Sequence, residues 1–190
     1  MTIFGEKPLE PVVRNCRFRQ GIVYIDKNKP VKILDLGCGP KAQFYQYLKD
    51  KNYQILKYVG MDPLVKLETG NSKLETIGKK IKNKLPFENN SFDYVTGLAF
   101  LEHLNRPELI VKESIRVLKP SGRAIFTAPS IALKPFLETG AALGFLSKRE
   151  IAEHKHYFSK TKMLALVPKN CRGQHHYFQM GLNNLLLIEK

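Results

Sequence analysis

Short hydrophobic runs alternate along the chain with stretches whose apolar residues recur at helical spacing. Three of the runs have the length and the β-branched or aromatic content of buried strands. Between the first two runs, the stretch KAQFYQYLKD places Phe44, Tyr47 and Leu48 on one helical face. Strands that alternate with helices predict a parallel sheet covered by helices. The three runs occupy residues 31–36, 57–62 and 92–99.

The pattern predicts further elements on either side of these runs. We expect a helix over 8–20, a helix that begins at Pro107, and a turn at the stretch KPSG before a strand of sequence RAIFTAP. Residues 131–146 form an apolar helix candidate, and a later helix is predicted to be capped by Ser159 and ended by Pro168. The tail predicts a hairpin that turns at 181–184.

Length and composition bound the class of protein. The 190 residues predict a single domain, 1–190, with an ordinary apolar content of 43%. No apolar run is long enough to span a membrane, and the charged N-terminus does not resemble a signal peptide. The three cysteines, which form no C-x-x-C pair, favour a reducing, cytoplasmic location. The net charge of +14 makes nucleic acid a conceivable partner, although a lysine-rich solvated surface explains the charge more simply.

The stretch KILDLGCGPKA follows the first predicted strand and carries glycines at 37 and 39 with Ala42, in a dinucleotide-binding order. Asp35 stands two residues before the first glycine. A carboxylate there would repel a pyrophosphate but attract a cationic ligand. S-adenosylmethionine (SAM) carries an ammonium and a sulfonium and no phosphate, so the loop favours SAM over NAD. Ala42 then becomes an ordinary helix residue.

Asp62 is the last residue of the second predicted strand, at the position where a carboxylate accepts hydrogen bonds from ribose hydroxyls. A turn aspartate before Pro63 is the simpler alternative.

Five segments, in order, resemble the motifs of class I SAM-dependent methyltransferases: ILDLGCGP, VGMDP, LPFENNSFDYV, LEHL and RVLKPSGRAIFTAP. The closest similarity is to small members of the family, whose core domain stands nearly alone. The resemblance implies an α/β, Rossmann-like three-layer sandwich whose seven-stranded sheet is mostly parallel, with one antiparallel strand near the C-terminus. It also implies that residues 1–30 and an insertion at 130–160 cover the acceptor.

The family resemblance assigns roles to particular residues. It implies that Asp35, Gly37, Cys38 and Gly39 surround the methionine end of SAM, that Asp62 binds the ribose, and that Leu98 lies near the methionine portion. Two positions depart from the family pattern. Lys41 stands where many relatives have glycine, and no acid precedes LPF to bind adenine, so backbone and apolar groups at 81–85 are expected to hold the base.

Two histidines are candidates for removing a proton from the acceptor. His103, in LEHL, follows the strand at 92–99, and its ordinary pKa suits proton removal at neutral pH. Packing or capping of a helix is its alternative role. His156, in EHKHYF, could recognise the acceptor, and in an extended segment it would face the same side as His154. No third ligand has helpful spacing, so no metal site is predicted. His175 and His176 are expected at the surface.

The favoured function is therefore methyl transfer from SAM to a small or medium-sized acceptor. An RNA or other polyanionic acceptor bound by the basic surface is one alternative, and a non-catalytic SAM-binding module is another. An NAD-dependent oxidoreductase is disfavoured by Asp35. The sequence leaves the acceptor and the oligomeric state undetermined.

Overall fold

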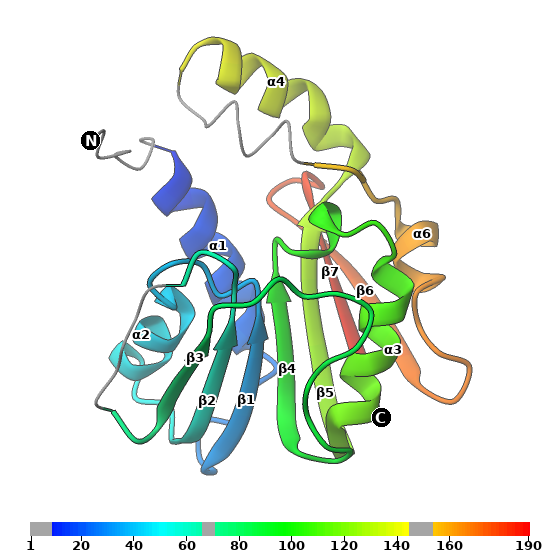
Figure 1. Cartoon of the computed structure of the whole chain (residues 1–190). Helices are drawn as coiled ribbons and strands as arrows, with labels where there is room; N and C mark the ends of the chain where they lie inside the picture. The colour runs from blue at the N-terminus through cyan, green and yellow to red at the C-terminus, as the bar shows by residue number, and fades with distance from the viewer. Residues whose placement is uncertain (1–8, 66–70, 145–153) are drawn as a thin grey trace.

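The computed structural model describes residues 9–65, 71–144 and 154–190. Its centre is a seven-stranded sheet in the order β3-β2-β1-β4-β5-β7-β6 (Figure 1). The strands are β1 Val31–Leu36, β2 Ile55–Met61, β3 Leu74–Ile77, β4 Phe92–Leu98, β5 Leu118–Pro129, β6 Arg172–Phe178 and β7 Asn183–Glu189. The helices are α1 Glu10–Ile22, α2 Gln43–Asp50, α3 Pro107–Val117, α4 Lys134–Ala142 and α6 Lys160–Leu164, with short 3-10 helices η1 Leu101–His103 and η2 Ile131–Leu133.

Strands β1 to β5 run parallel to one another. Strand β7 pairs antiparallel with both β5 and β6, so it is the one reversed strand. The predicted Rossmann-like fold with a C-terminal hairpin is confirmed. The order of the strands reverses between β1 and β4, which is where open α/β sheets bind ligands.

Helices cover both faces of the sheet because each strand of its centre is apolar on both sides. On one face Phe18 of α1 and Phe44 of α2 pack with Ile33 and Tyr58 of the sheet. On the other face the apolar side of α3 meets Leu34 and Val95 among other strand residues. Figure 1 shows the start of α1 and the whole of α4 beyond the carboxyl ends of the parallel strands.

Local differences from the sequence predictions have physical causes. The stretch KPSG lies inside β5 rather than in a turn: Ser121 has φ +62°, and the register with β4 jumps there, as in a β-bulge. Ala42 is the left-handed residue before α2, with φ +45°, and is not helical. Strand β3 was not predicted. The cap by Ser159 is confirmed, since its hydroxyl accepts the Lys162 N–H, although α6 ends at Leu164.

The expected helix over 131–146 is present as η2 and α4 up to Ala142, and residues 145 and 146 lie outside the described ranges. Within those ranges, the longest helices are too short or too polar to cross a membrane.

Candidate functional site

The glycine loop after β1 is closed against the end of β2. The backbone N–H groups of Gly37 and Cys38 both donate to the Met61 carbonyl, at 2.8 and 3.3 Å. Gly37 has φ +74°, and a Cβ added there would lie 2.7 Å from the Phe100 ring. Both the backbone conformation and the ring therefore require glycine at this position.

Gly39 differs from Gly37 because the space beside it is open. Its φ is +71°, and no described atom lies within 4 Å of an added Cβ. Its N–H donates to the Asp62 carboxylate at 3.1 Å, so the acid after β2 meets the loop after β1. The other Asp62 oxygen accepts the Leu64 N–H at 2.8 Å. Each carboxylate oxygen retains accepting capacity for a ribose hydroxyl.

Asp35 lies within the sheet, one residue before the loop begins to turn. It pairs in register with Gly60 on one side and Thr96 on the other, and it is 3% exposed. One oxygen accepts the Thr96 hydroxyl at 2.6 Å and the other accepts the Tyr58 hydroxyl. Burial raises the pKa of Asp35 to about 6 despite these two bonds. Both carboxylate oxygens are thus bound within the sheet, so any effect of the Asp35 charge on a ligand in the loop would act through space.

The side chain of Cys38 packs inward from the same loop. Its sulfur lies 2.8 Å from where a Cβ on Gly60 would stand, so Gly60 leaves the space that the thiol fills. Burial raises the pKa of the Cys38 thiol, and the nearby Asp35 and Asp62 raise it further. A buried, protonated thiol is a packing group rather than a nucleophile.

Leu98 is the last residue of β4 and is half-buried. Its methyl groups lie 3.4 Å from a Cβ built on Gly21 of α1, so it joins the end of the sheet to the N-terminal helix. Lys41 is exposed to solvent in the loop.

A cluster of polar side chains follows β4. Glu102 of η1 is fully buried, and neither of its carboxylate oxygens has a hydrogen-bond partner among the described residues. Burial raises the pKa of Glu102 to about 7, and the charge of Arg17 on α1 partly offsets this. The ring of His103 lies 5.0 Å from that of His154, centroid to centroid. One potential ligand atom from each of Glu102, His103 and His154 lies within 4.8 Å of the others.

Backbone bonds hold the 154–158 segment over this cluster. The N–H groups of Lys155 and His156 both donate to the Glu102 carbonyl, at 2.8 and 3.3 Å. Burial lowers the pKa of His154 to about 4, with further contributions from His103 and Arg17. The ring of His156 lies 5.8 Å from that of Phe158, and its Nε2 is buried without a partner in the described chain. Sequence spacing did not predict the approach of His154 to His103.

Side chains of α3 bind the backbone of Leu85, which belongs to the segment 81–85 expected to hold adenine. Glu113 accepts the Leu85 N–H at 2.9 Å, and Arg116 donates to the Leu85 carbonyl at 3.0 Å. Both backbone groups of Leu85 therefore already have partners, and the side chain of Ile81 is half-buried.

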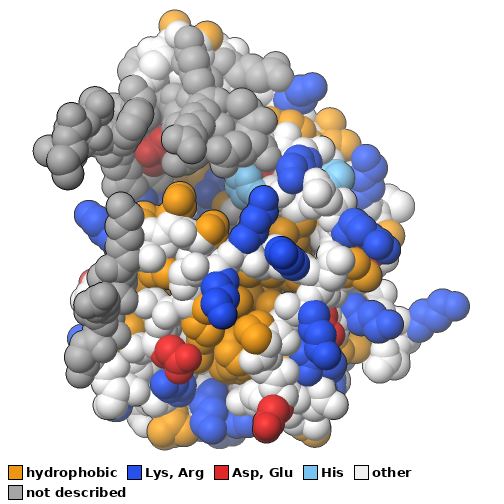
Figure 2. Space-filling view, viewed as in Figure 1, with side chains coloured by type: hydrophobic (Ala, Val, Ile, Leu, Met, Phe, Trp, Pro, Cys, Tyr) orange, Lys and Arg blue, Asp and Glu red, His pale blue; other side chains and the backbone are white. Residues whose placement is uncertain are grey.

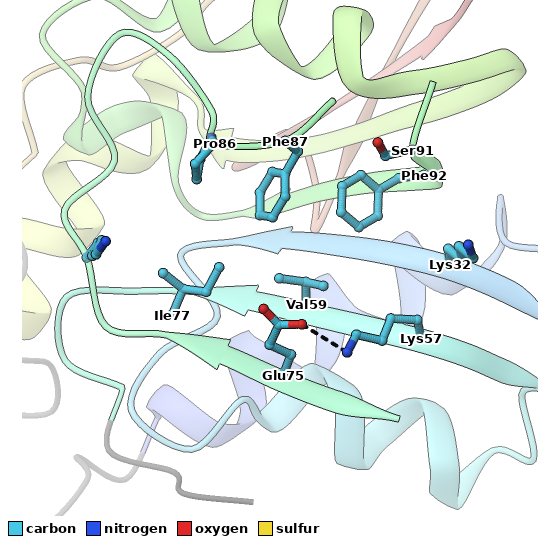
Figure 3. Close-up of a pocket in the computed structure, with 10 residues that line it drawn as sticks. Lys32, Lys57, Val59, Glu75, Ile77, Pro86, Phe87, Ser91 and Phe92 are labelled. Carbon is cyan, nitrogen blue, oxygen red and sulfur yellow. Dashed lines mark ion pairs between the residues drawn. The ribbon is translucent and has the colours of Figure 1, made fainter. Parts of the chain in front are cut away.

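A separate cavity of about 640 Å³ lies on the α3 side of the sheet (Figure 3). Val59, Ile77 and Phe92 form part of its apolar floor, and Lys57 and Glu75 pair across its rim at 2.9 Å. The predicted cofactor residues do not line it. Figure 2 shows lysine and arginine side chains distributed around an apolar patch on this face.

Comparisons with known proteins match methyltransferases. The family described as "Methyltransferase domain" matches residues 34–126. An uncharacterized methyltransferase of Schizosaccharomyces pombe is 36% identical over 111 residues, covering 50% of this chain and 38% of that protein. The ubiquinone biosynthesis O-methyltransferase of Photobacterium profundum is 23% identical over 162 residues, covering 81% and 68%. This chain spans about half the length, or less, of several curated relatives that it matches.

Two solved structures share the fold. A chain of the Haloferax volcanii complex that contains the Trm112 methyltransferase activator superposes with a TM-score of 0.76 at 13% identity, covering 95% of this chain and 91% of the other. A SAM-dependent methyltransferase of Aquifex aeolicus superposes with a TM-score of 0.67 at 15% identity, covering 97% and 94%.

Proposed function

We propose that this chain is a class I SAM-dependent methyltransferase, which its match to the methyltransferase family over residues 34–126 supports, and that it transfers a methyl group from SAM to a small or medium-sized acceptor. The observation that carries the proposal is the contact between the Gly39 N–H and the Asp62 carboxylate. It joins a glycine loop and an acid at the carboxyl ends of neighbouring strands, next to the point where the strand order reverses.

The loop residues fit the cofactor. The open space beside Gly39 lets a ligand approach the backbone, and the carboxylate of Asp62 supplies acceptors for ribose hydroxyls. Asp35, Gly37 and Cys38 would shape the methionine end, with Leu98 beside it. When bound, SAM supplies a methyl group that is activated by its attachment to a sulfonium.

The acceptor would be held beyond the carboxyl ends of the strands. We assign its cover to the N-terminal segment, residues 1–30, and to residues 130–160, within one domain of 1–190. The described parts of these segments include α1, α4 and the 154–158 stretch, whose backbone bonds to Glu102. Residues 1–8 and 145–153 lie outside the described ranges.

Positioning supplies much of the rate in such a transfer, and an acceptor that carries a proton needs a base. His103 and His156 are our candidates, because both lie after β4 or against its connection. As a base, the neutral imidazole of His103 accepts the acceptor's proton at a ring nitrogen. The same proposal places the protein in the cytoplasm, in keeping with the free cysteines at 16, 38 and 171.

Calorimetric titration with SAM tests the cofactor assignment. We expect the wild-type chain to bind SAM, and Asp35→Asn to bind at least about tenfold more weakly, because about 1.4 kcal/mol of charge attraction corresponds to that factor. Asp50→Asn, at the exposed end of α2, is the matched control and should bind as the wild type does. Unchanged affinity in Asp35→Asn would refute the charge argument, and absence of SAM binding by the wild type would refute the function.

A polyanionic acceptor such as RNA is a second candidate, favoured by the net charge of +14 and by the lysine and arginine side chains that Figure 2 shows. It predicts that binding falls steeply with salt concentration, because each phosphate contact releases counterions. Affinity for RNA that does not depend on salt would exclude it.

A further inference from the structure

The carboxylate of Glu102 is the least satisfied polar group in the described part of the sheet's ligand-binding edge. It is 0% exposed, and neither oxygen has a hydrogen-bond partner among the described residues. Each buried polar atom without a hydrogen-bond partner lowers the stability of the folded state by about 1–3 kcal/mol, and such atoms are therefore rare in native structures. Protonation of Glu102 would not remove this cost, because the acid would still bury an unpaired donor and acceptor.

The groups around Glu102 are ligands for metal ions. His103 comes from the same 3-10 helix, and His154 arrives from a segment about fifty residues later. The potential ligand atoms of these three residues lie within 4.8 Å of one another. The Nδ1 atom of His154 is also buried without a partner in the described chain.

The approach of His154 is fixed by backbone contacts. The Lys155 and His156 N–H groups bind the Glu102 carbonyl, which places the residue before them beside η1. Glu102 and His103 thus come from η1, and His154 comes from the segment that is hydrogen-bonded to it.

We propose that Glu102, His103 and His154 bind one divalent first-row transition-metal ion, as Zn²⁺ or Co²⁺ would bind. Two imidazole nitrogens and one carboxylate suit such ions, whereas Mg²⁺ and Ca²⁺ favour oxygen ligands. Metal–ligand distances of about 2.0–2.2 Å place ligand atoms roughly 3.3 Å apart, so the three side chains close by small rotations on binding. Three protein ligands leave a position open, as in catalytic zinc sites.

The positive charge of Arg17 disfavours a cation at this site. Its positive charge influences both Glu102 and His154, so it opposes a bound cation. We therefore expect an exchangeable ion rather than a permanently held structural one. If the proposed methyltransferase function holds, the open position would take an acceptor oxygen and lower its pKa, and His103 would serve as a ligand instead of a base.

Titration with Co²⁺ tests the site without any use of activity. We expect one equivalent to bind to the wild type, with visible d–d bands typical of nitrogen and oxygen ligation. Glu102→Gln and His154→Gln keep the size of each side chain and should bind at least roughly 100-fold more weakly, since even partners of metal ligands are worth about 10- to 100-fold. Competition with Zn²⁺ should remove the bands.

The control is His176→Gln, which removes an exposed histidine from β6 and should leave binding unchanged. Circular dichroism melting shows that each variant is folded. The proposal is overturned if the folded wild type binds no Co²⁺, if the two cluster variants bind as it does, or if the control loses binding equally. SAM titration of the same samples is independent, so failure of the metal site and failure of the methyltransferase function are distinguished.

Discussion

The ends of β1 and β4 each carry a buried carboxylate, but only one of the two is satisfied. Asp35 is bound by the hydroxyls of Thr96 and Tyr58, which the neighbouring strands supply in register. Glu102, at the end of β4, has no such partner among the described residues. Burial raises the pKa of both groups. The first carboxylate has its partners within the protein, and we propose that a metal ion completes the second.

The largest loss of stability is expected from a substitution at Gly37, which follows β1 and lies against the Phe100 ring. Gly37→Ala forces a left-handed residue to carry a Cβ and places that Cβ 2.7 Å from the Phe100 ring. Strain and overpacking together should lower the free energy of unfolding by about 4 kcal/mol. Gly39→Ala, where φ is similar but the space is open, should cost only about 1–2 kcal/mol. Urea denaturation measures both, and equal losses would contradict the assigned contact.

The two carboxylates should respond alike to pH when no metal is present. The folded pKa of Asp35 is about 6 against 3.8 for the free group, and that of Glu102 is about 7 against 4.5. Because the fold favours the protonated form, the stability that each contributes at low pH is lost as pH rises through the folded pKa. Asp35→Asn and Glu102→Gln cannot ionise, so each should gain about 3 kcal/mol relative to wild type between about pH 4 and pH 8.

Thermal melting at the two pH values measures this gain. Added Zn²⁺ then separates the carboxylates: it should stabilise the wild type and Asp35→Asn at the higher pH, and leave Glu102→Gln unchanged. A gain at only one of the two sites, without metal, would show that their environments differ in more than hydrogen bonding.

The smallest effect is expected from removing one partner of Asp35. Thr96→Val deletes the hydroxyl that donates to this carboxylate at 2.6 Å and should cost about 1–3 kcal/mol near neutral pH. Thr127→Val is the matched control, since Thr127 is equally buried and its hydroxyl accepts the Ala99 N–H rather than donating to a carboxylate in the described chain. Urea denaturation measures the free energy of unfolding of both variants. Equal losses would mean that the hydrogen bond to Asp35 stabilises the fold no more than the bond made by Thr127.

The meeting of Gly39 and Asp62 could be predicted because Asp62 directly follows β2 and Gly39 lies in the loop after β1, and parallel strands end at one edge. The approach of His154 to Glu102 could not be predicted, because it depends on backbone bonds between η1 and residues 155 and 156, which lie about fifty positions later and beyond α3, β5 and α4. Strand β3 escaped prediction for a different reason: its four residues, LETI, are too few to show a period, and only Leu74 is buried.

The backbone conformations of Ala42 and Ser121 also could not be predicted from the sequence pattern. Both have positive φ without being glycine, so the backbone at each is set by its tertiary surroundings: Ala42 is buried before α2, and Ser121 sits in the bulge of β5. Local preference favoured an ordinary helix residue at the first. At the second it favoured a turn, whereas the residue lies within β5 at an irregularity of the register.

Helix α1 lies outside the sheet, yet Arg17 projects its charge onto Glu102 and His154 while Gly21 abuts Leu98. The electrostatic potential at Glu102 and His154 thus depends on a residue of α1. If the proposed metal site exists, exchange of Arg17 for a neutral residue would raise its affinity for a cation, with every strand left as it is.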